Sequence, residues 1–195
     1  MQQKDLEYLY SLKKYVFIIA IIFILSLIIG LIISVKYPEL SKNYLDTFQN
    51  QFGWIKTLNP IAIMLLIFLN NAFKSFLSLV LGIGLGVIPV LFVAANGVII
   101  GMFANIIAKQ NGTLFVIAAL VPHGIIEVPM VLISAGVGLR LGYKMYPSLL
   151  GFKTDINKEL REGIGFYVRF VLPLLFLAAI IETFVTPVIA SLVMK

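Results

Sequence analysis

The chain contains apolar runs that are too long for the core of a small soluble domain, and the first of them, residues 15–34, is uninterrupted: YVFIIAIIFILSLIIGLIIS. About 20 apolar residues in a helix cover a bilayer core of about 30 Å. Hydrophobic residues make up 61% of the 195 residues and charged residues 12%, whereas an ordinary soluble domain is about 45–50% apolar. The sequence therefore predicts an all-α polytopic protein of a cell membrane, with one integral membrane domain, residues 1–195.

Basic residues gather at the ends of the apolar runs and give the chain a net charge of +6. In a membrane protein this clustering orients the helices, with Lys and Arg in the cytoplasm, and does not indicate nucleic acid as a partner. We expect a cytoplasmic interfacial segment at 1–14, an extracytoplasmic amphipathic loop at 36–58 and a basic cytoplasmic loop at 140–165. Amphipathic interfacial helices would occupy these segments, and the N-terminus would be cytoplasmic.

The number of crossings follows from placing both basic segments in the cytoplasm, since an even number of crossings must then separate them. Polar residues divide the intervening chain into five apolar segments: 15–34, 58–73, 75–95, 97–108 and 113–139. Five is odd, so we expect one segment to be re-entrant or a half-helix, either the short 97–108 or 113–139, which Pro122 and Pro129 interrupt. With the last apolar run, 166–193, the prediction is about five crossings plus a re-entrant or broken half-helix.

The stretch VPHGIIEVPM, residues 121–130, holds the only histidine of the chain, His123, four residues before Glu127. Positions four apart share a helix face, so the two side chains can meet and satisfy one another. If Pro122 starts a helix, His123 lies in its opening turn, among free backbone N–H groups. Ionisable groups within membrane spans are costly and normally face the bundle interior or a wet cavity. The pair is compatible with a structural clasp between helices, a transport or proton path, a metal site or catalysis.

A metal site would need more ligands than His123 and Glu127 provide, and only Glu182, Asn70 and Asn96 are polar residues at a comparable depth. Cysteine is absent, which excludes thiolate sites and iron–sulfur clusters. The sequence has no HExxH, no GxSxG and no second histidine, so it gives hydrolytic chemistry little support. We therefore expect no metal and no cofactor.

The polar centre that we expect at membrane depth comprises six residues: His123, Glu127, Asn70, Asn71, Asn96 and Glu182. Asparagine side chains in such a position can bridge helices by amide hydrogen bonds. Glu182 has no basic neighbour at helical spacing. Either His123 or Arg140 would be its partner, or burial would keep its carboxyl group protonated and neutral. Lys74 is expected near an interface, where its long side chain can reach water.

Glycines recur at the spacing that lets helices approach closely, as in the pairs Gly82 with Gly86 and Gly97 with Gly101. Gly124, between His123 and Glu127, is a further candidate for helix packing. We expect these small residues to set the distances between helices.

Four sequence elements occur in a characteristic order: NN at 70–71, GIGLG at 82–86, NGVIIG at 96–101 and PHGIIEVPMVLISAGVGLRLG at 122–142. In this order they resemble the stage II sporulation protein M family over most of residues 60–190, with the HGxxE element and the trailing GLRLG as the specific part. The resemblance implies an intramembrane centre built from eight residues: Asn70, Asn71, Asn96, Gly97, Gly101, His123, Gly124 and Glu127. For spore-forming bacteria, the resemblance implies a membrane scaffold that recruits peptidoglycan-degrading partners during engulfment. Members of the family also occur where no sporulation takes place.

Three functions follow as hypotheses. The resemblance favours a non-enzymatic scaffold that associates with itself or with other membrane proteins, while the broken segments and the ionisable pair favour a transporter or channel for an ion or small solute. An intramembrane enzyme is the third. A sealed, mutually bonded cluster around His123 would support the scaffold, and a cavity open to water would support transport. In each case the lipid bilayer is the surrounding partner.

Overall fold

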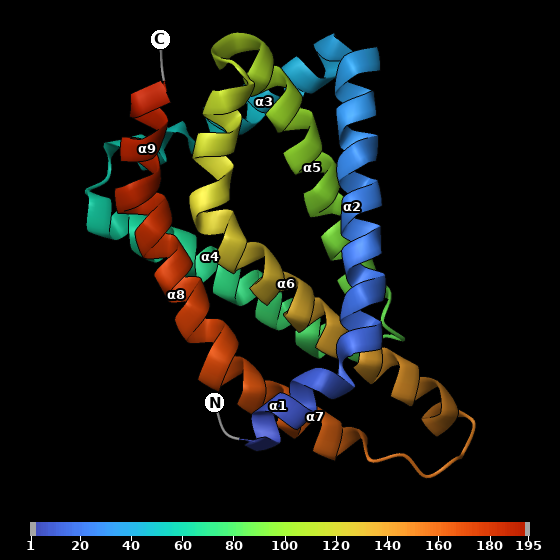
Figure 1. Cartoon of the computed structure of the whole chain (residues 1–195). Coiled ribbons are helices and arrows are strands. Elements are labelled where there is room, and N and C mark those ends of the chain that lie inside the picture. The colour runs from blue at the N-terminus through green and yellow to red at the C-terminus, as the bar shows by residue number, and fades with distance from the viewer. Residues whose placement is uncertain (1–2, 194–195) are drawn as a thin grey trace.

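A computed structural model of the chain describes residues 3–193, and Figure 1 shows that these residues form a bundle of helices. No strand occurs in that range. The α-helices are α1 (Gln3–Ser11), α2 (Lys13–Lys36), α3 (Pro38–Phe52), α4 (Pro60–Val80), α5 (Val87–Asn111), α6 (Thr113–Leu149), α7 (Ile156–Phe166), α8 (Leu172–Ile180) and α9 (Thr186–Val193). Shorter helical segments join them: the 3₁₀ segments η1 (Gly53–Thr57) and η2 (Leu81–Ile83), and the π-helical segments η3 (Tyr167–Val171) and η4 (Ile181–Val185).

Five stretches of the described chain are long and apolar enough to cross a membrane: Lys13–Lys36, Pro60–Ile83, Val87–Asn111, Thr113–Leu149 and Ile156–Val193. The last stretch runs from α7 to α9 without interruption. At 1.5 Å per residue, even the 24 residues of the first stretch extend about 36 Å, which exceeds a hydrocarbon core of about 30 Å. The prediction of an all-α polytopic membrane protein with about five crossings is confirmed.

The chain reverses direction between α4 and α5 at the glycine series, and not at the polar residues that separate the predicted segments. Lys74 lies inside α4 and Asn96 lies inside α5. Leu85 and Gly86 have φ angles of +56° and +75°, in the left-handed region, which Gly86 adopts at little cost because it has no Cβ. Residues 60–111 thus supply two crossings instead of three. An even number of crossings therefore separates the two basic segments without any re-entrant segment.

Helix α6 contains three prolines and is nevertheless a single helix of 37 residues. It begins at Thr113, so His123 lies well inside the helix and not in an opening turn, and the expectation that Pro122 starts a helix is wrong. Pro122 and Pro129 each remove one backbone hydrogen bond, which allows a helix to bend. Figure 1 shows α6 changing direction near its middle. The helix is bent but continuous, and a re-entrant course is not confirmed.

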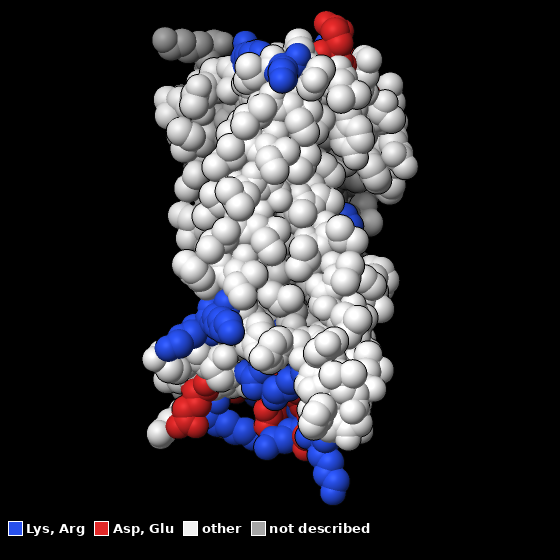
Figure 2. All heavy atoms as spheres, turned by 90° about the vertical axis from the view of Figure 1, so that its right-hand side faces the viewer, with Lys and Arg blue, Asp and Glu red and all other residues white. Residues whose placement is uncertain are grey.

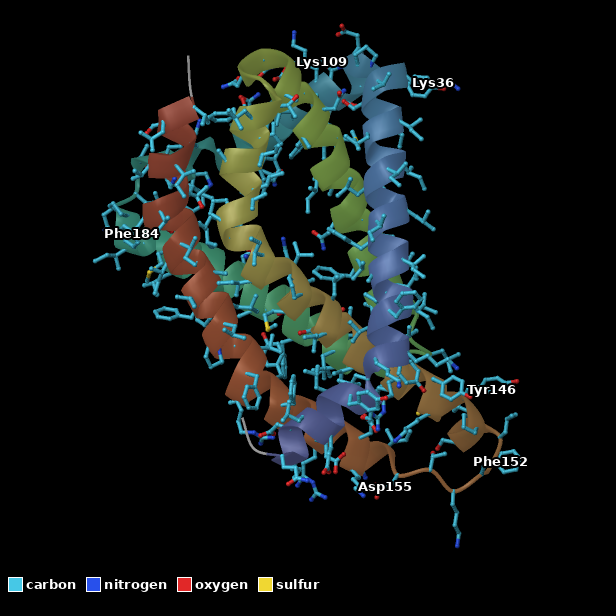
Figure 3. All side chains as sticks on the ribbon, viewed as in Figure 1. Lys36, Lys109, Tyr146, Phe152, Asp155 and Phe184 are labelled. Carbon is cyan, nitrogen blue, oxygen red and sulfur yellow. The ribbon has the colours of Figure 1, made fainter. Side chains whose placement is uncertain are left out.

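Charged residues gather at the two ends of the bundle and leave an almost uncharged band between them (Figure 2). One end carries α1, α7 and the loop between α6 and α7, and we refer to it as the α1–α7 end (Figure 1). The other end carries α3. In Figure 3, Lys36 and Lys109 lie at the α3 end, while Phe152 and Asp155 lie at the α1–α7 end. The two basic segments, as far as the structure describes them, therefore lie on one side of the bundle.

Glycines bring the long helices into backbone contact. A methyl group at Gly97 in α5 would lie 2.8 Å from the backbone oxygen of Phe23 in α2, and one at Gly101 would lie 2.2 Å from that of Leu27. A methyl group at Gly82 would lie 2.1 Å from the carbonyl oxygen of Gly138 in α6. Distances below 3.0 Å are not tolerated, so these positions require glycine as long as the helices keep their present separation. The bundle that carries the polar residues is therefore tightly fixed along its α2–α5 and α4–α6 contacts.

Candidate functional site: an intramembrane His–Glu–Glu centre

His123, Glu127 and Glu182 converge within the membrane-spanning helices, and we call them the His–Glu–Glu centre. His123 and Glu127 lie one turn apart on α6, and the π-helical segment η4 supplies Glu182. One potential ligand atom from each residue lies within 4.8 Å of the other two. Arg140, the other partner considered for Glu182, is paired with Glu159 instead. The structure thus brings together three of the six polar residues that the sequence singled out.

The π-helical segment η4, residues 181–185, is the local feature that directs Glu182. A π turn inserts an extra residue into a helix and so changes the face that the neighbouring residues present. Such turns are frequent at functional sites. The sequence of this run is ordinary for a membrane helix, so the direction of Glu182 could not be predicted from it.

Within the described residues, the three members of the centre are not joined to one another by hydrogen bonds. Nδ1 of His123 lies 3.4 Å from the hydroxyl oxygen of Thr186, at the start of α9. Oε2 of Glu127 is buried and has no hydrogen-bond partner among the described residues. No hydrogen bond joins His123 to Glu127 within residues 3–193, so the mutual pairing that the sequence suggested is absent. A buried polar atom without a partner costs free energy, which makes the unpartnered oxygen of Glu127 a candidate for binding a ligand.

The remaining predicted residues have local roles. The side chain of Asn70 donates to that of Asn71 at 3.1 Å, and Asn96 donates to the carbonyl oxygen of Phe92 on its own helix at 2.9 Å. These amides therefore do not bridge helices, contrary to the expectation. A methyl group at Gly124 would meet nothing within 4 Å, so helix packing does not require a glycine there either.

The three asparagines instead line a cavity of about 100 Å³ that also receives Lys74 and Glu127, and we call it the polar cavity. Its walls come from α2, α4, α5 and α6. A water molecule needs about 10–15 Å³ of such volume, so several fit. Lys74 contributes an ammonium group to this space and forms no ion pair among residues 3–193. Glu127 belongs both to the polar cavity and to the His–Glu–Glu centre, and it connects the two.

A second cavity adjoins the polar cavity towards the α3 end of the bundle. It has a volume of about 170 Å³ and lies between α5 and α6, where Ile100 contributes to the walls of both cavities. Its lining is entirely apolar: Ile100, Phe103, Ala104, Ile107, Phe115, Val116, Ala119 and Leu120. The α5–α6 interface is thus loosely packed over a considerable part of its length, in contrast to the α2–α5 contact.

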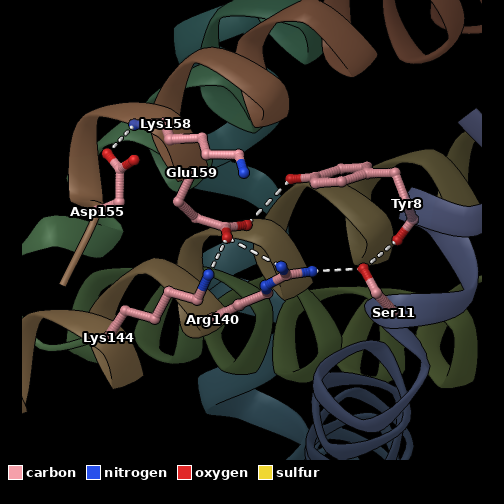
Figure 4. A network of polar contacts seen from close by, with 7 residues as sticks. All are labelled: Tyr8, Ser11, Arg140, Lys144, Asp155, Lys158 and Glu159. Carbon is pink, nitrogen blue, oxygen red and sulfur yellow. Dashed lines mark hydrogen bonds and ion pairs between the residues drawn. The ribbon is translucent and has the colours of Figure 1, made fainter. Parts of the chain in front are cut away.

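A separate ion network locks the α1–α7 end (Figure 4). The carboxylate of Glu159, whose side chain is 1% exposed, lies 2.9 Å from Arg140 and 2.5 Å from Lys144. Tyr8 donates a hydrogen bond of 3.3 Å to the same carboxylate, and Arg140 donates to Ser11 at 2.5 Å. Burial and the adjacent Glu159 raise the pKa of Tyr8 above its ordinary value, so the phenol stays protonated and keeps donating. The network ties α1, α6 and α7 together.

This network was not predicted, although the sequence contains a partial signal for it. Arg140 and Lys144 are four residues apart on α6 and so present two cations on one face. Two cations at the end of a membrane helix indicate that a carboxylate lies nearby. The helix α7 contains two candidates, Glu159 and Glu162, and the spacing of residues does not predict which of them is buried.

Comparisons with known proteins agree with this architecture. The family model described as stage II sporulation protein M matches residues 19–187. Two proteins of Methanocaldococcus jannaschii are similar to the chain. The uncharacterized protein MJ0793 is 33% identical over 153 residues, which cover 76% of this chain and 78% of that protein. The uncharacterized protein MJ0706 is 29% identical over 175 residues, which cover 87% of this chain and 76% of that protein. No solved structure gives a significant match. The matched range contains three of the five membrane-spanning stretches completely and most of the first and the last, and the chain belongs to the stage II sporulation protein M family.

Proposed function

We propose that the chain moves a small cation across the membrane and that the His–Glu–Glu centre is its binding site. The observation that carries this proposal is the unpartnered carboxylate oxygen of Glu127, which is buried within a membrane helix beside the polar cavity. A polar group at this depth is costly unless it is paired, and a purely structural clasp would pair it. An unpaired acid in contact with a small polar space is what a cation-binding step requires.

The surroundings of the centre support this reading. The polar cavity and the adjoining apolar cleft together follow the α5–α6 interface from Glu127 towards the α3 end. The prolines that bend α6 flank His123 and Glu127 and leave nearby carbonyl oxygens without helical partners. Transport sites in membrane proteins combine such irregular helices with ionisable side chains near mid-membrane.

The test is cation flux in liposomes that contain the purified full-length chain, with internal dyes for pH and for divalent cations. We expect flux above that of empty liposomes, and a decrease of at least about tenfold for Glu127→Gln, which corresponds to about 1.4 kcal/mol. Glu39→Gln makes the same chemical change at an exposed position in α3 and should retain the flux of the original chain. Flux of the original chain equal to that of empty liposomes, for protons and divalent cations alike, would reject the proposal.

A scaffold that organises membrane partners, or copies of itself, is the second candidate, and a different observation favours it. The α1–α7 end has an open hollow of about 560 Å³ lined by charged side chains of α1, α6 and α7 and of η3. Its lining includes Lys4, Asp5, Glu7, Arg140, Arg161, Glu162 and Arg169. The ion network holds these helices rigidly, as a docking surface requires. The liposome experiment separates the two candidates, because a scaffold gives no flux.

We further propose that the α1–α7 end faces the cytoplasm, because both basic segments, 1–14 and 140–165, belong to this end as far as the structure describes them. The chain has no cysteine, so single cysteines can be introduced without removing native ones. Lys42→Cys, at an exposed site of α3, should react with a membrane-impermeant maleimide in intact cells, whereas Lys153→Cys, in the loop before α7, should react only after the cells are opened. The reverse pattern would invert the topology.

A further inference from the structure

We propose that the His–Glu–Glu centre binds one divalent transition-metal ion, of the class of Zn²⁺, Mn²⁺, Fe²⁺ or Co²⁺. This inference deepens the proposed function and rests on it for the movement of the ion, since it names the class of cation that the site would pass. Binding itself is argued from the geometry of three residues and can be tested without transport.

The distances allow all three residues to reach one ion. Their ligand atoms lie within 4.8 Å of one another, and atoms bound to one ion at about 2.0–2.2 Å in tetrahedral geometry are about 3.4 Å apart. The ligand atoms therefore need to approach one another by at most about 1.4 Å. His123 and Glu127 are one turn apart on α6, a spacing that presents two ligands on one helix face.

The surroundings orient the ligands for this role. Thr186 is 7% exposed, and its hydroxyl oxygen lies 3.4 Å from Nδ1 of His123 and can accept the hydrogen of that nitrogen. Nε2 then remains free as the ligand atom, and metal-binding histidines are usually held through their other ring nitrogen in this way. Oε2 of Glu127 is buried and unpartnered. A carboxylate oxygen of Glu182, which η4 supplies, lies within 4.8 Å of one oxygen of Glu127.

Charge balance favours a divalent ion. Two carboxylates and a neutral imidazole carry a charge of −2, which a divalent ion neutralises, so that the occupied centre has no net charge inside the membrane. Among residues 3–193, neither Glu127 nor Glu182 forms an ion pair with a basic residue. Lys74 lines the polar cavity together with Glu127, and it too forms no ion pair in that range.

The ligand set selects the class of metal. One imidazole nitrogen with two carboxylates suits Zn²⁺, Mn²⁺, Fe²⁺ and Co²⁺, whereas Cu⁺ prefers sulfur. Ca²⁺ takes six to eight oxygen ligands, and Mg²⁺ prefers an octahedral shell of oxygen and water. Three protein ligands beside the polar cavity leave coordination positions open for water, as in sites that exchange a ligand.

The experiment uses full-length protein in detergent, freed of its affinity tag and stripped with a chelator, and titrated with Mn²⁺ and with Zn²⁺. We expect one ion per chain, measured for Mn²⁺ by loss of its free-ion electron paramagnetic resonance signal and for Zn²⁺ by calorimetry. Glu182→Gln should weaken binding at least about tenfold. Glu162→Gln, a matched change in the open hollow of the α1–α7 end, should bind as the original chain does. Equal binding by Glu182→Gln and the original chain overturns the site.

A second measurement does not depend on any variant folding correctly. Mn²⁺ bound to the original chain should show magnetic coupling to one imidazole nitrogen, and absence of that coupling overturns the proposal. The outcomes also separate the two proposals. Metal binding without flux in liposomes leaves the site standing and removes the transport function. Proton flux without metal binding leaves transport standing and removes the metal site.

Discussion

Replacing Glu159 with alanine is expected to lower the free energy of unfolding by about 3–5 kcal/mol, because it leaves Arg140 buried without its partner. The side chain of Arg140 is 14% exposed and that of Glu159 is 1% exposed. Water reaches Arg140 only from the open hollow, so it replaces the lost interaction only in part. Lys144, whose side chain is 37% exposed, can turn outward and contributes less to the loss. For a chain of this size the change corresponds to a fall of about 6–20 °C in the melting temperature, which thermal unfolding in detergent would measure.

Glu162→Ala is the matched control, since Glu162 is on the same helix and lines the open hollow. Its melting temperature should stay close to that of the original chain, with a change within about 0.5 kcal/mol. Replacing both Glu159 and Arg140 by apolar residues of similar size should recover part of the loss, because no buried charge then remains unpaired. If Glu159→Ala melts like Glu162→Ala, the ion network does not hold α1 and α7 to the bundle.

The crossings could be predicted from the sequence because they depend on a short-range property. Runs such as residues 15–34 are apolar over the full thickness of a bilayer, and helices alone satisfy every backbone group there. The clustering of Lys and Arg likewise predicted which segments lie at the same end of the bundle, and the structure places them together. The position of His123 and Glu127 one turn apart on the same face of a helix followed from helical spacing alone, although the two side chains do not bond to each other.

Polar residues and prolines inside these runs were harder to interpret. The predicted segments end at Lys74 and at Asn96, but α4 and α5 continue through these residues, and both line the polar cavity. Asn96 also finds a local acceptor, the carbonyl oxygen of Phe92 on its own helix. The predicted helix start at Pro122 is wrong because a transmembrane helix tolerates proline when its neighbours shield the freed groups. The amide that does bridge helices is Asn105, which donates to Ser34 of α2 at 3.0 Å.

The parts of the structure that the sequence does not predict depend on contacts between residues far apart in the chain. Glu159 meets Tyr8 across a separation of 151 residues, and Glu182 meets α6 through a π turn that no residue pattern predicts. Such contacts depend on how complete helices pack against one another. The sequence named Glu182 as an ionisable residue in need of a partner, and only the packing of η4 against α6 identifies His123 and Glu127 as its neighbours.

A substitution of Gly138 by alanine is expected to have the second large effect, because it adds a methyl group where two backbones touch. The new carbon would lie 2.4 Å from the carbonyl oxygen of Ser78 and 2.7 Å from the ring of Pro89. Neither the backbone of α4 nor a proline ring can rotate away, so α4 and α6 must separate. Overpacking of this kind costs about 1–3 kcal/mol and occasionally more, which the melting temperature in detergent would report.

Gly124→Ala provides the control within the same helix, since a methyl group there meets nothing within 4 Å. Alanine favours a helix over glycine by about 1 kcal/mol, so this variant should be as stable as the original chain or more stable. Equal melting of Gly138→Ala and the original chain would show that α4 and α6 are farther apart than the structure places them.

The contact between α4 and α6 also has a functional consequence. α4 carries Lys74 and α6 carries Glu127 on facing walls of the polar cavity, so separating the two helices widens the cavity. Gly138→Ala should therefore alter cation flux as well as stability, whereas Gly124→Ala should leave stability unharmed.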